Sequence, residues 1–294
     1  MRRIAWTVAA VLAGSAALVG GLQLAARLDD GGEASDQIIG SAAADDPGVL
    51  HVHALGVNPA DGLLYVATHT GLFRLGEEGG LTRIADRFQD TMGFTVVGPD
   101  RFYASGHPDL REDLPSRLGL IESTDAGETW RAVSMQGEAD LHAIAHGVDV
   151  LYAADSTSGK VLASLDGGAT WDERGTAPLA ALAIDPADPD HLAGASYEGG
   201  LLVSTDGGRT WQPVAGPPVA ALVWDTNGLT ALAPDGTVQR AAAPQDSWDV
   251  VGQLGSPGVA LATDSDRLYA ATDTGALARS DDGGRTWTPL TAAT

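Results

Sequence analysis

The sequence contains no cysteine and few cationic side chains. Its 294 residues include 17 Lys and Arg against 39 Asp and Glu, which gives a formal net charge of −22. Without cysteine, the fold needs no disulfide, and the chain cannot be a lipoprotein anchored through Cys. Nucleic acids and anionic lipid surfaces attract Lys/Arg patches, so this charge argues against either as a partner.

Long hydrophobic runs are also absent, apart from one near the N-terminus. Residues 4–26 carry no charged side chain and follow Arg2 and Arg3. We expect residues 1–28 to be a helical signal peptide or signal anchor, because the length of the run fits either. Residues 29–48 are rich in Gly, Ala, Ser and Asp, which predicts a flexible linker. The body, 49–294, should then be extracytoplasmic, either secreted or anchored to the membrane only through its N-terminal segment.

One eight-residue phrase recurs four times in this body. Each copy fits the pattern S-x-D-x-G-x-T-W, and the tryptophans of three successive copies lie 41 and 40 residues apart. A repeat of about 40 residues predicts stacked units of supersecondary structure. The four copies occupy residues 123–130, 164–171, 204–211 and 280–287.

The phrase is typical of a hairpin turn between two strands. Its Gly supplies a positive φ, its Asp and Ser bond backbone groups, and its Thr and Trp suit the start of the next strand. Each Trp should fill space between neighbouring sheets. A calcium site is disfavoured, because each turn offers one committed carboxylate where calcium takes about six to eight oxygens. The residues that we assign to this structural role are Asp125, Trp130, Asp166, Trp171, Asp206, Trp211, Asp282 and Trp287.

Short apolar runs alternate with Gly, Pro and Asp turns around each phrase, four runs to a unit. Four short strands per repeat are typical of a β-propeller blade. We therefore predict an all-β, six-bladed β-propeller with four-stranded blades, preceded by the N-terminal hydrophobic helix. The first and last blades should meet, with Leu50 near Leu290. The six predicted units are 50–84, 92–133, 141–174, 179–215, 219–250 and 259–290.

The repeated phrase resembles the Asp-box, or bacterial neuraminidase repeat, of sialidases, sortilin-type receptors, xyloglucan-releasing glycosidases and photosystem assembly propellers. Residues 49–290 are similar to exported bacterial propellers labelled glycosyl hydrolase or exo-α-sialidase, most clearly in segments 51–57, 59–69, 92–96 and 105–108. The resemblance implies Asp-boxes on the face opposite the site, and glycoside hydrolysis as the activity of any enzyme. Sialidases place a catalytic arginine in an F/Y-R-I-P motif. Here the corresponding segment is Leu72-Phe73-Arg74-Leu75, so no sialidase catalytic residue is transferred.

Histidines recur at equivalent positions of the predicted blades. Two lie at the starts of first strands and two at the ends of second strands, and these positions share one face because strand direction alternates. We call this face, opposite the Asp-box turns, the top face, and we predict one site on it. Its predicted ligand-binding residues are His53, His69, His107, His142, Asp155 and Arg111.

Convergent imidazoles and carboxylates suit a small polar ligand, a glycan or a protein partner. They also suit a transition metal, zinc or copper, with the four histidines as ligands, because neutral imidazole is a usual donor to both. Polar residues lining a wet central channel are the alternative interpretation. A glycoside hydrolase would need two carboxylates, and the catalytic candidates are Asp109 and Asp113, in an insertion at 107–117, and Asp155. The predicted function is ligand binding by a monomeric exported propeller, with glycoside hydrolysis as the alternative.

Overall fold

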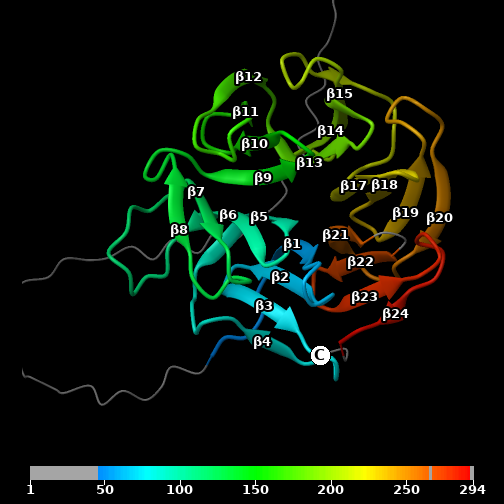
Figure 1. The fold of residues 1–294 in the computed structure, drawn as a ribbon. Coiled ribbons are helices and arrows are strands. Elements are labelled where there is room, and N and C mark those ends of the chain that lie inside the picture. The colour runs from blue at the N-terminus through cyan, green and yellow to red at the C-terminus, as the bar shows by residue number, and fades with distance from the viewer. Residues whose placement is uncertain (1–45, 265–266, 292–294) are drawn as a thin grey trace, which may run out of the picture. The chain divides into compact units, whose positions relative to one another are not determined.

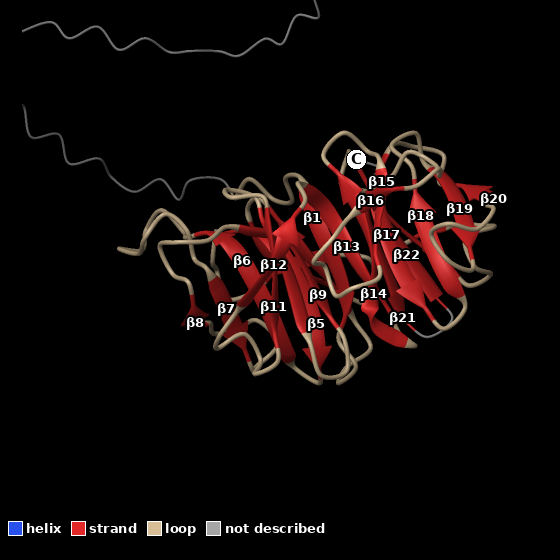
Figure 2. Ribbon diagram, turned by 90° about the horizontal axis from the view of Figure 1, so that it is seen from above, coloured by secondary structure: helices blue, strands red, loops and turns tan. Residues whose placement is uncertain are grey.

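The computed structural model describes residues 46–264 and 267–291. Within these ranges the chain forms 24 strands and no helix (Figure 2). No helix in the described part of the chain is long and apolar enough to cross a membrane. The predicted signal segment 1–28 and most of the predicted linker lie outside the described residues.

The strands form six sheets arranged in a ring (Figure 1). Each sheet consists of four consecutive strands paired in sequence order, so each sheet is one blade, as predicted. Blades 1 to 3 consist of β1 (Val52–Val57), β2 (Leu64–Thr68), β3 (Gly71–Leu75) and β4 (Leu81–Arg83); β5 (Asp90–Gly98), β6 (Arg101–His107), β7 (Leu120–Ser123) and β8 (Arg131–Ser134); and β9 (Leu141–His146), β10 (Leu151–Asp155), β11 (Lys160–Ser164) and β12 (Asp172–Thr176). Blades 4 to 6 consist of β13 (Leu179–Asp185), β14 (Asp188–Ser196), β15 (Leu201–Ser204) and β16 (Gln212–Pro213); β17 (Ala221–Asp225), β18 (Gly228–Leu232), β19 (Thr237–Ala241) and β20 (Asp249–Gln253); and β21 (Gly258–Asp264), β22 (Arg267–Thr272), β23 (Leu277–Ser280) and β24 (Thr288–Pro289).

The hydrophobic core lies between neighbouring blades. The second strands β2 and β10 are buried at every position, because an adjacent blade covers each face of the sheet. Strands buried on both faces are continuous apolar runs rather than alternating ones, which is the pattern that the sequence shows there. The first strands of successive blades contact one another around the whole ring.

The Asp-box turns join the third and fourth strands of blades 2, 3, 4 and 6. In blade 3, Ser164 Oγ donates to Asp166 Oδ1 (2.8 Å) and accepts from the amide of Gly168 (2.8 Å). The amide and hydroxyl of Thr170 donate to the Asp166 carboxylate at 2.9 and 2.6 Å, and the Thr170 hydroxyl is the main cause that lowers the pKa of Asp166 to about 2. Gly168 has a φ of +86°, and a Cβ at this position would overlap Leu120 of blade 2. The same bonds recur in the other three copies, around Asp125, Asp206 and Asp282.

Each Asp-box Trp packs on the core between its own blade and the preceding one. Trp171 lies against the cluster that contains Tyr103 and Leu120 of blade 2, and its Nε1 donates to Ser134 Oγ of the same blade (2.9 Å). The side chains are half-buried rather than enclosed. The equivalent residues Trp130, Trp211 and Trp287 pack on the corresponding clusters.

The ring closes where blade 1 packs against blade 6. Their shared core contains residues of both sheets, and Val49 and Leu290 pack against it from the two ends of the body. The end of the predicted linker is already bound to blade 1, because Asp46 pairs with Arg83 and the carbonyl of Gly48 accepts a hydrogen bond from Thr70 Oγ1 (2.5 Å).

Candidate functional site

A β-bulge interrupts the first strand of five blades at the same position. The register of β1 against β2 shifts between Val52 and Ala54, which leaves His53 as the extra residue, and His142 is the extra residue of β9. Bulges leave one residue out of the ladder and re-aim its side chain. This position is the one at which the histidines align in the sequence. The equivalent bulged residues of blades 2, 4 and 6 are Met92, Ala180 and Val259.

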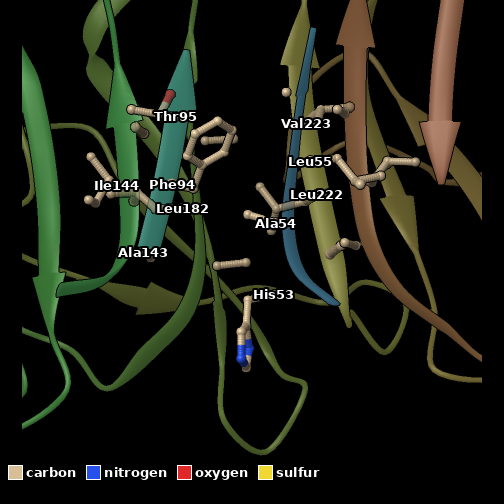
Figure 3. Close-up of a pocket in the computed structure, with 18 of the residues that line it drawn as sticks. His53, Ala54, Leu55, Phe94, Thr95, Ala143, Ile144, Leu182, Leu222 and Val223 are labelled. Atoms are coloured by element: carbon tan, nitrogen blue, oxygen red, sulfur yellow. The ribbon is translucent and has the colours of Figure 1, made fainter. Parts of the chain in front are cut away.

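A central channel of about 370 Å³ runs between the six first strands. His53 and His142 lie at its top end and His146 and Trp224 at the other, and most of the wall between them is Ala, Leu and Val. Figure 3 shows His53 at one end of this pocket, beyond the apolar side chains. His53 and His142 bring polar side chains to the top mouth.

The first polar cluster at this mouth, which we call the Asp90 group, consists of His53, His69 and Asp90. His53 Nε2 lies 3.3 Å from Asp90 Oδ1, and His69 Nδ1 lies 2.9 Å from Asp90 Oδ2. The two histidines come from blade 1 and the carboxylate from blade 2, so the group joins two blades. The Asp90 side chain is 14% exposed and that of His69 is 57% exposed, so the group reaches from the interior to solvent.

The second cluster, which we call the Asp140 group, consists of His107, Asp140, His142 and Tyr197, from blades 2, 3 and 4. Asp140 Oδ2 accepts from His142 Nε2 (2.9 Å) and from Ser156 Oγ (3.1 Å), and His107 Nε2 lies 3.8 Å away. The hydroxyl of Tyr197 lies 3.4 Å from His142 Nδ1. Burial acts to raise the pKa of Asp140, but the hydrogen bond and charge of His142, the charge of His107 and the hydrogen bond from Ser156 together lower it.

The four histidines therefore do not form the single cluster that the sequence predicted. In the described part of the chain, only His53, His69 and Asp90 bring three potential metal-ligand atoms within 4.8 Å of one another. His107 and His142 lie instead beside Asp140, and His107 Nδ1 is held by the carbonyl of Ser116 in the insertion (2.7 Å). The predicted top-face site contains all four histidines, but they are divided between two carboxylates.

Two other predicted site residues, Asp109 and Arg111, bind each other. Arg111 Nη2 donates to Asp109 Oδ2 (2.6 Å), and Asp109 also accepts from the amides of Phe88 and Arg111 (both 2.9 Å). Arg111, followed by these amides, holds the pKa of Asp109 well below its usual range. These contacts fasten the insertion to the segment between β4 and β5. They leave Asp109 poorly suited to act as a general acid.

Asp155 and Asp113 differ in their surroundings. Asp155 is buried, and its oxygens accept from the amide of Asp140 (3.1 Å) and from Ser158 Oγ (2.5 Å), so its contacts stabilise the end of β10. Asp113 is exposed on the insertion. The structure thus brings Asp155 close to the Asp140 group, but as a residue that holds the backbone.

Sequence reasoning missed Asp90, Asp140 and Tyr197. The two carboxylates could have been found by aligning the residues that lie two positions before the bulged residue, or its equivalent, of each blade. That residue is His or Asp in blades 1 to 3 and Pro in blades 4 to 6. Tyr197 follows β14 in the same way that His69 follows β2, since its amide donates to Pro178 as the amide of His69 donates to His51. In chain order, the residues at this aligned position are His51, Asp90, Asp140, Pro178, Pro218 and Pro257.

A larger hollow, of about 660 Å³, lies on the Asp-box face between blades 3 and 4. Val148 and Leu165 are exposed beside it. Its arginines are engaged locally, since Arg174 Nε lies 3.2 Å from Asp172 and Arg209 donates to the carbonyl of Asp206 (2.7 Å). Because the top mouth concentrates the imidazoles and buried carboxylates, we take the top mouth as the candidate site.

Comparison with known proteins supports the repeat and the fold. The family model for the BNR/Asp-box repeat matches residues 202–213, which cover the phrase in blade 4. No curated protein matches the sequence significantly.

Three solved structures illustrate the likeness of fold. The GH74 enzyme of Niastella koreensis is 16% identical, with a TM-score of 0.57 over 82% of this chain and 45% of that chain. The GH74 xyloglucanase of Xanthomonas campestris is 21% identical, with a TM-score of 0.54 over the same shares, 82% and 45%. A chain of a nidogen–laminin complex is 12% identical, with a TM-score of 0.61 over 78% of this chain and 93% of that chain.

The chain spans less than half the length of the two GH74 proteins. At these identities the likeness shows the fold and not the activity. The recurrent Asp-box turns, the match to the repeat and the six-bladed ring together identify the chain as an Asp-box β-propeller.

Proposed function

We propose that this protein is a ligand-binding propeller that takes a small, neutral, polyhydroxylated ligand such as a glycan at the top mouth of its channel. One observation carries the proposal. The Asp140 group places an exposed tyrosine and two imidazoles from three blades around one buried carboxylate, on the face opposite the Asp-boxes.

The Asp140 carboxylate orients the polar groups around it. When His142 Nε2–H donates to Asp140, its Nδ1 is an acceptor and faces the hydroxyl of Tyr197. The Tyr197 oxygen then keeps lone pairs for a ligand donor, and its ring, 53% exposed as a residue, offers a rigid apolar face. Hydroxyl groups of a sugar match this combination of acceptors, donors and an aromatic surface.

The charge of the protein argues for a neutral ligand over an acidic one. The net charge is −22, and Asp90 and Asp140 both lie at the mouth. The predicted cationic site residue, Arg111, is bound to Asp109 and to the carbonyl of Asp86. A sialic acid carboxylate would therefore meet repulsion here.

The test is calorimetric titration of the full-length protein with neutral xyloglucan oligosaccharides and, in parallel, with sialyllactose. The first probe is the substrate class named for the Xanthomonas campestris neighbour. We expect the neutral probe to bind, Tyr197→Ala and His142→Ala to weaken its affinity at least tenfold, and sialyllactose to bind at least tenfold more weakly. Val148→Ala, an exposed change on the Asp-box face, is the control and should leave affinity unchanged.

Two results would overturn the proposal. One is the absence of neutral-glycan binding, and the other is tighter binding of sialyllactose. Chromatography of the titrated sugars tests the alternative function as well, because released shorter sugars would identify a glycoside hydrolase.

A further inference from the structure

We infer that the Asp90 group is a binding site for a divalent transition-metal ion, zinc or copper, with His53, His69 and Asp90 as its protein ligands. The inference rests on the proposed function, because it assigns a ligand to the other half of the same top-face site. Its evidence comes from a separate set of side chains.

The spacing of the ligand atoms fits a metal. Zinc bonds to nitrogen and oxygen are about 2.0–2.2 Å long, so adjacent ligand atoms of a tetrahedral site lie about 3.3–3.6 Å apart. His53 Nε2 lies 3.3 Å from Asp90 Oδ1 and His69 Nδ1 lies 2.9 Å from Asp90 Oδ2. One ligand atom from each of the three residues can be chosen so that all three atoms lie within 4.8 Å of one another. Small movements of the side chains would complete the coordination.

Two of these atoms make no hydrogen bond. His53 Nε2 and Asp90 Oδ1 are both buried and lie 3.3 Å apart, but neither has a hydrogen-bond partner in the described part of the chain. A buried polar atom without a partner destabilises the folded state, so a native protein normally satisfies it. A metal ion bound between them would satisfy both. Asp140 Oδ1 is also buried without a hydrogen-bond partner, but in the described part of the chain only the Asp90 group brings three potential ligand atoms within 4.8 Å of one another.

The donor set selects the kind of metal. Two imidazoles and one carboxylate suit zinc and copper, whereas calcium and magnesium take oxygen ligands. Three protein ligands leave one tetrahedral position open. A further imidazole, that of His51, lies beside the group, with its ring centroid 6.3 Å from that of His69. His51 has a φ of +45°, in the left-handed region, and its carbonyl accepts the amide of His69 (3.1 Å), so the backbone fixes it beside the group.

The experiment is a titration of the full-length protein, freed of metal with EDTA, with Zn²⁺ and separately with Cu²⁺ in competition with a chromophoric chelator. We expect one equivalent to bind. His69→Ala and Asp90→Asn should each weaken the affinity at least 100-fold, because loss of even an outer-shell partner weakens metal binding about 10- to 100-fold. Ca²⁺ should not compete.

His107→Ala is the matched control, since His107 ends β6 as His69 follows β2, and it should change the affinity less than threefold. His69 is mostly exposed, so His69→Ala keeps the test valid even if Asp90→Asn fails to fold. No tight binding by the wild type, an equal loss in His107→Ala, or undiminished binding in His69→Ala would overturn the inference.

The outcomes separate the two proposals. Glycan binding that fails while Zn²⁺ binding depends on His69 would refute the glycan proposal alone. Glycan binding that survives in a protein without a zinc site would refute the metal inference alone.

Discussion

Replacement of Trp171 by Ala tests whether the Asp-box tryptophans hold neighbouring blades together. The indole packs on the core between blades 2 and 3 and donates to Ser134 Oγ at 2.9 Å. Full burial would make Trp→Ala cost about 3–5 kcal/mol, and we take about half of that because Trp171 is half-buried. The lost hydrogen bond adds about 0.5–1.5 kcal/mol. The expected total is a loss of about 2–4 kcal/mol in the free energy of unfolding.

Thermal unfolding followed by circular dichroism measures this loss. A domain of this size loses about 2–4 °C of Tm per kcal/mol, so Trp171→Ala should lower the Tm by about 5–15 °C. Trp171→Phe, which keeps a ring but not the indole N–H, is the control and should lose roughly half as much. A change in Tm below about 2 °C for Trp171→Ala would refute the role of the indole between blades.

Two further predictions concern the turns and the contact between the first strands of blades 2 and 3. The pKa values of Asp166 and Asp282 are lowered to about 2 in the folded protein, chiefly by the hydroxyls of Thr170 and Thr286. Their stabilising contribution is therefore complete above the unfolded value of about 4 and is lost as the pH falls from about 4 to 2. Tm should drop over that interval, and Asp166→Asn should flatten the drop, whereas Asp113→Asn on the exposed insertion should not; an identical pH profile for Asp166→Asn would contradict the linkage. Gly93→Ala in β5 should cost about 1–3 kcal/mol, because the new Cβ would overlap the carbonyl of Leu141 in blade 3. Gly98→Ala, at the open end of the same strand, should be nearly neutral in chemical denaturation, and equal stabilities of the two variants would refute this account.

The blades were predictable from the sequence because each one repeats the same physical solution. The Asp-box fixes the turn between the third and fourth strands, and its Trp marks the contact with the preceding blade. Apolar runs such as Leu64–Thr68 mark the second strands, since these lie between two other blades. The turn, the Trp and the apolar second strand together fix where each strand of a repeat begins and which strand it pairs with.

The top-face site was only partly predictable. Alignment of the strands predicted that the histidines share one face, but it could not show how they divide between carboxylates. Asp90 and Asp140 precede or begin their strands, where a carboxylate is as typical of a turn as of a site. The bulges at His53 and His142 are invisible in the alternation of the sequence. Conversely, Asp109 and Asp155 are two carboxylates, as a catalytic pair requires, but both have structural partners. Asp109 binds Arg111, and Asp155 accepts a hydrogen bond from the amide of Asp140.

Every blade of this ring takes its four strands from one continuous stretch of chain, and within residues 46–264 and 267–291 no strand from the C-terminal end joins the sheet of blade 1. The seam between blades 6 and 1 is therefore made by side chains, like the other five seams. A circular permutant would have its original termini joined and new termini placed in a loop between two blades. Every ladder of backbone hydrogen bonds would then still lie within one blade. Circular permutants that begin at successive blades should therefore fold to the same ring. The same property lets gene duplication add or remove a whole blade without breaking a single strand pair.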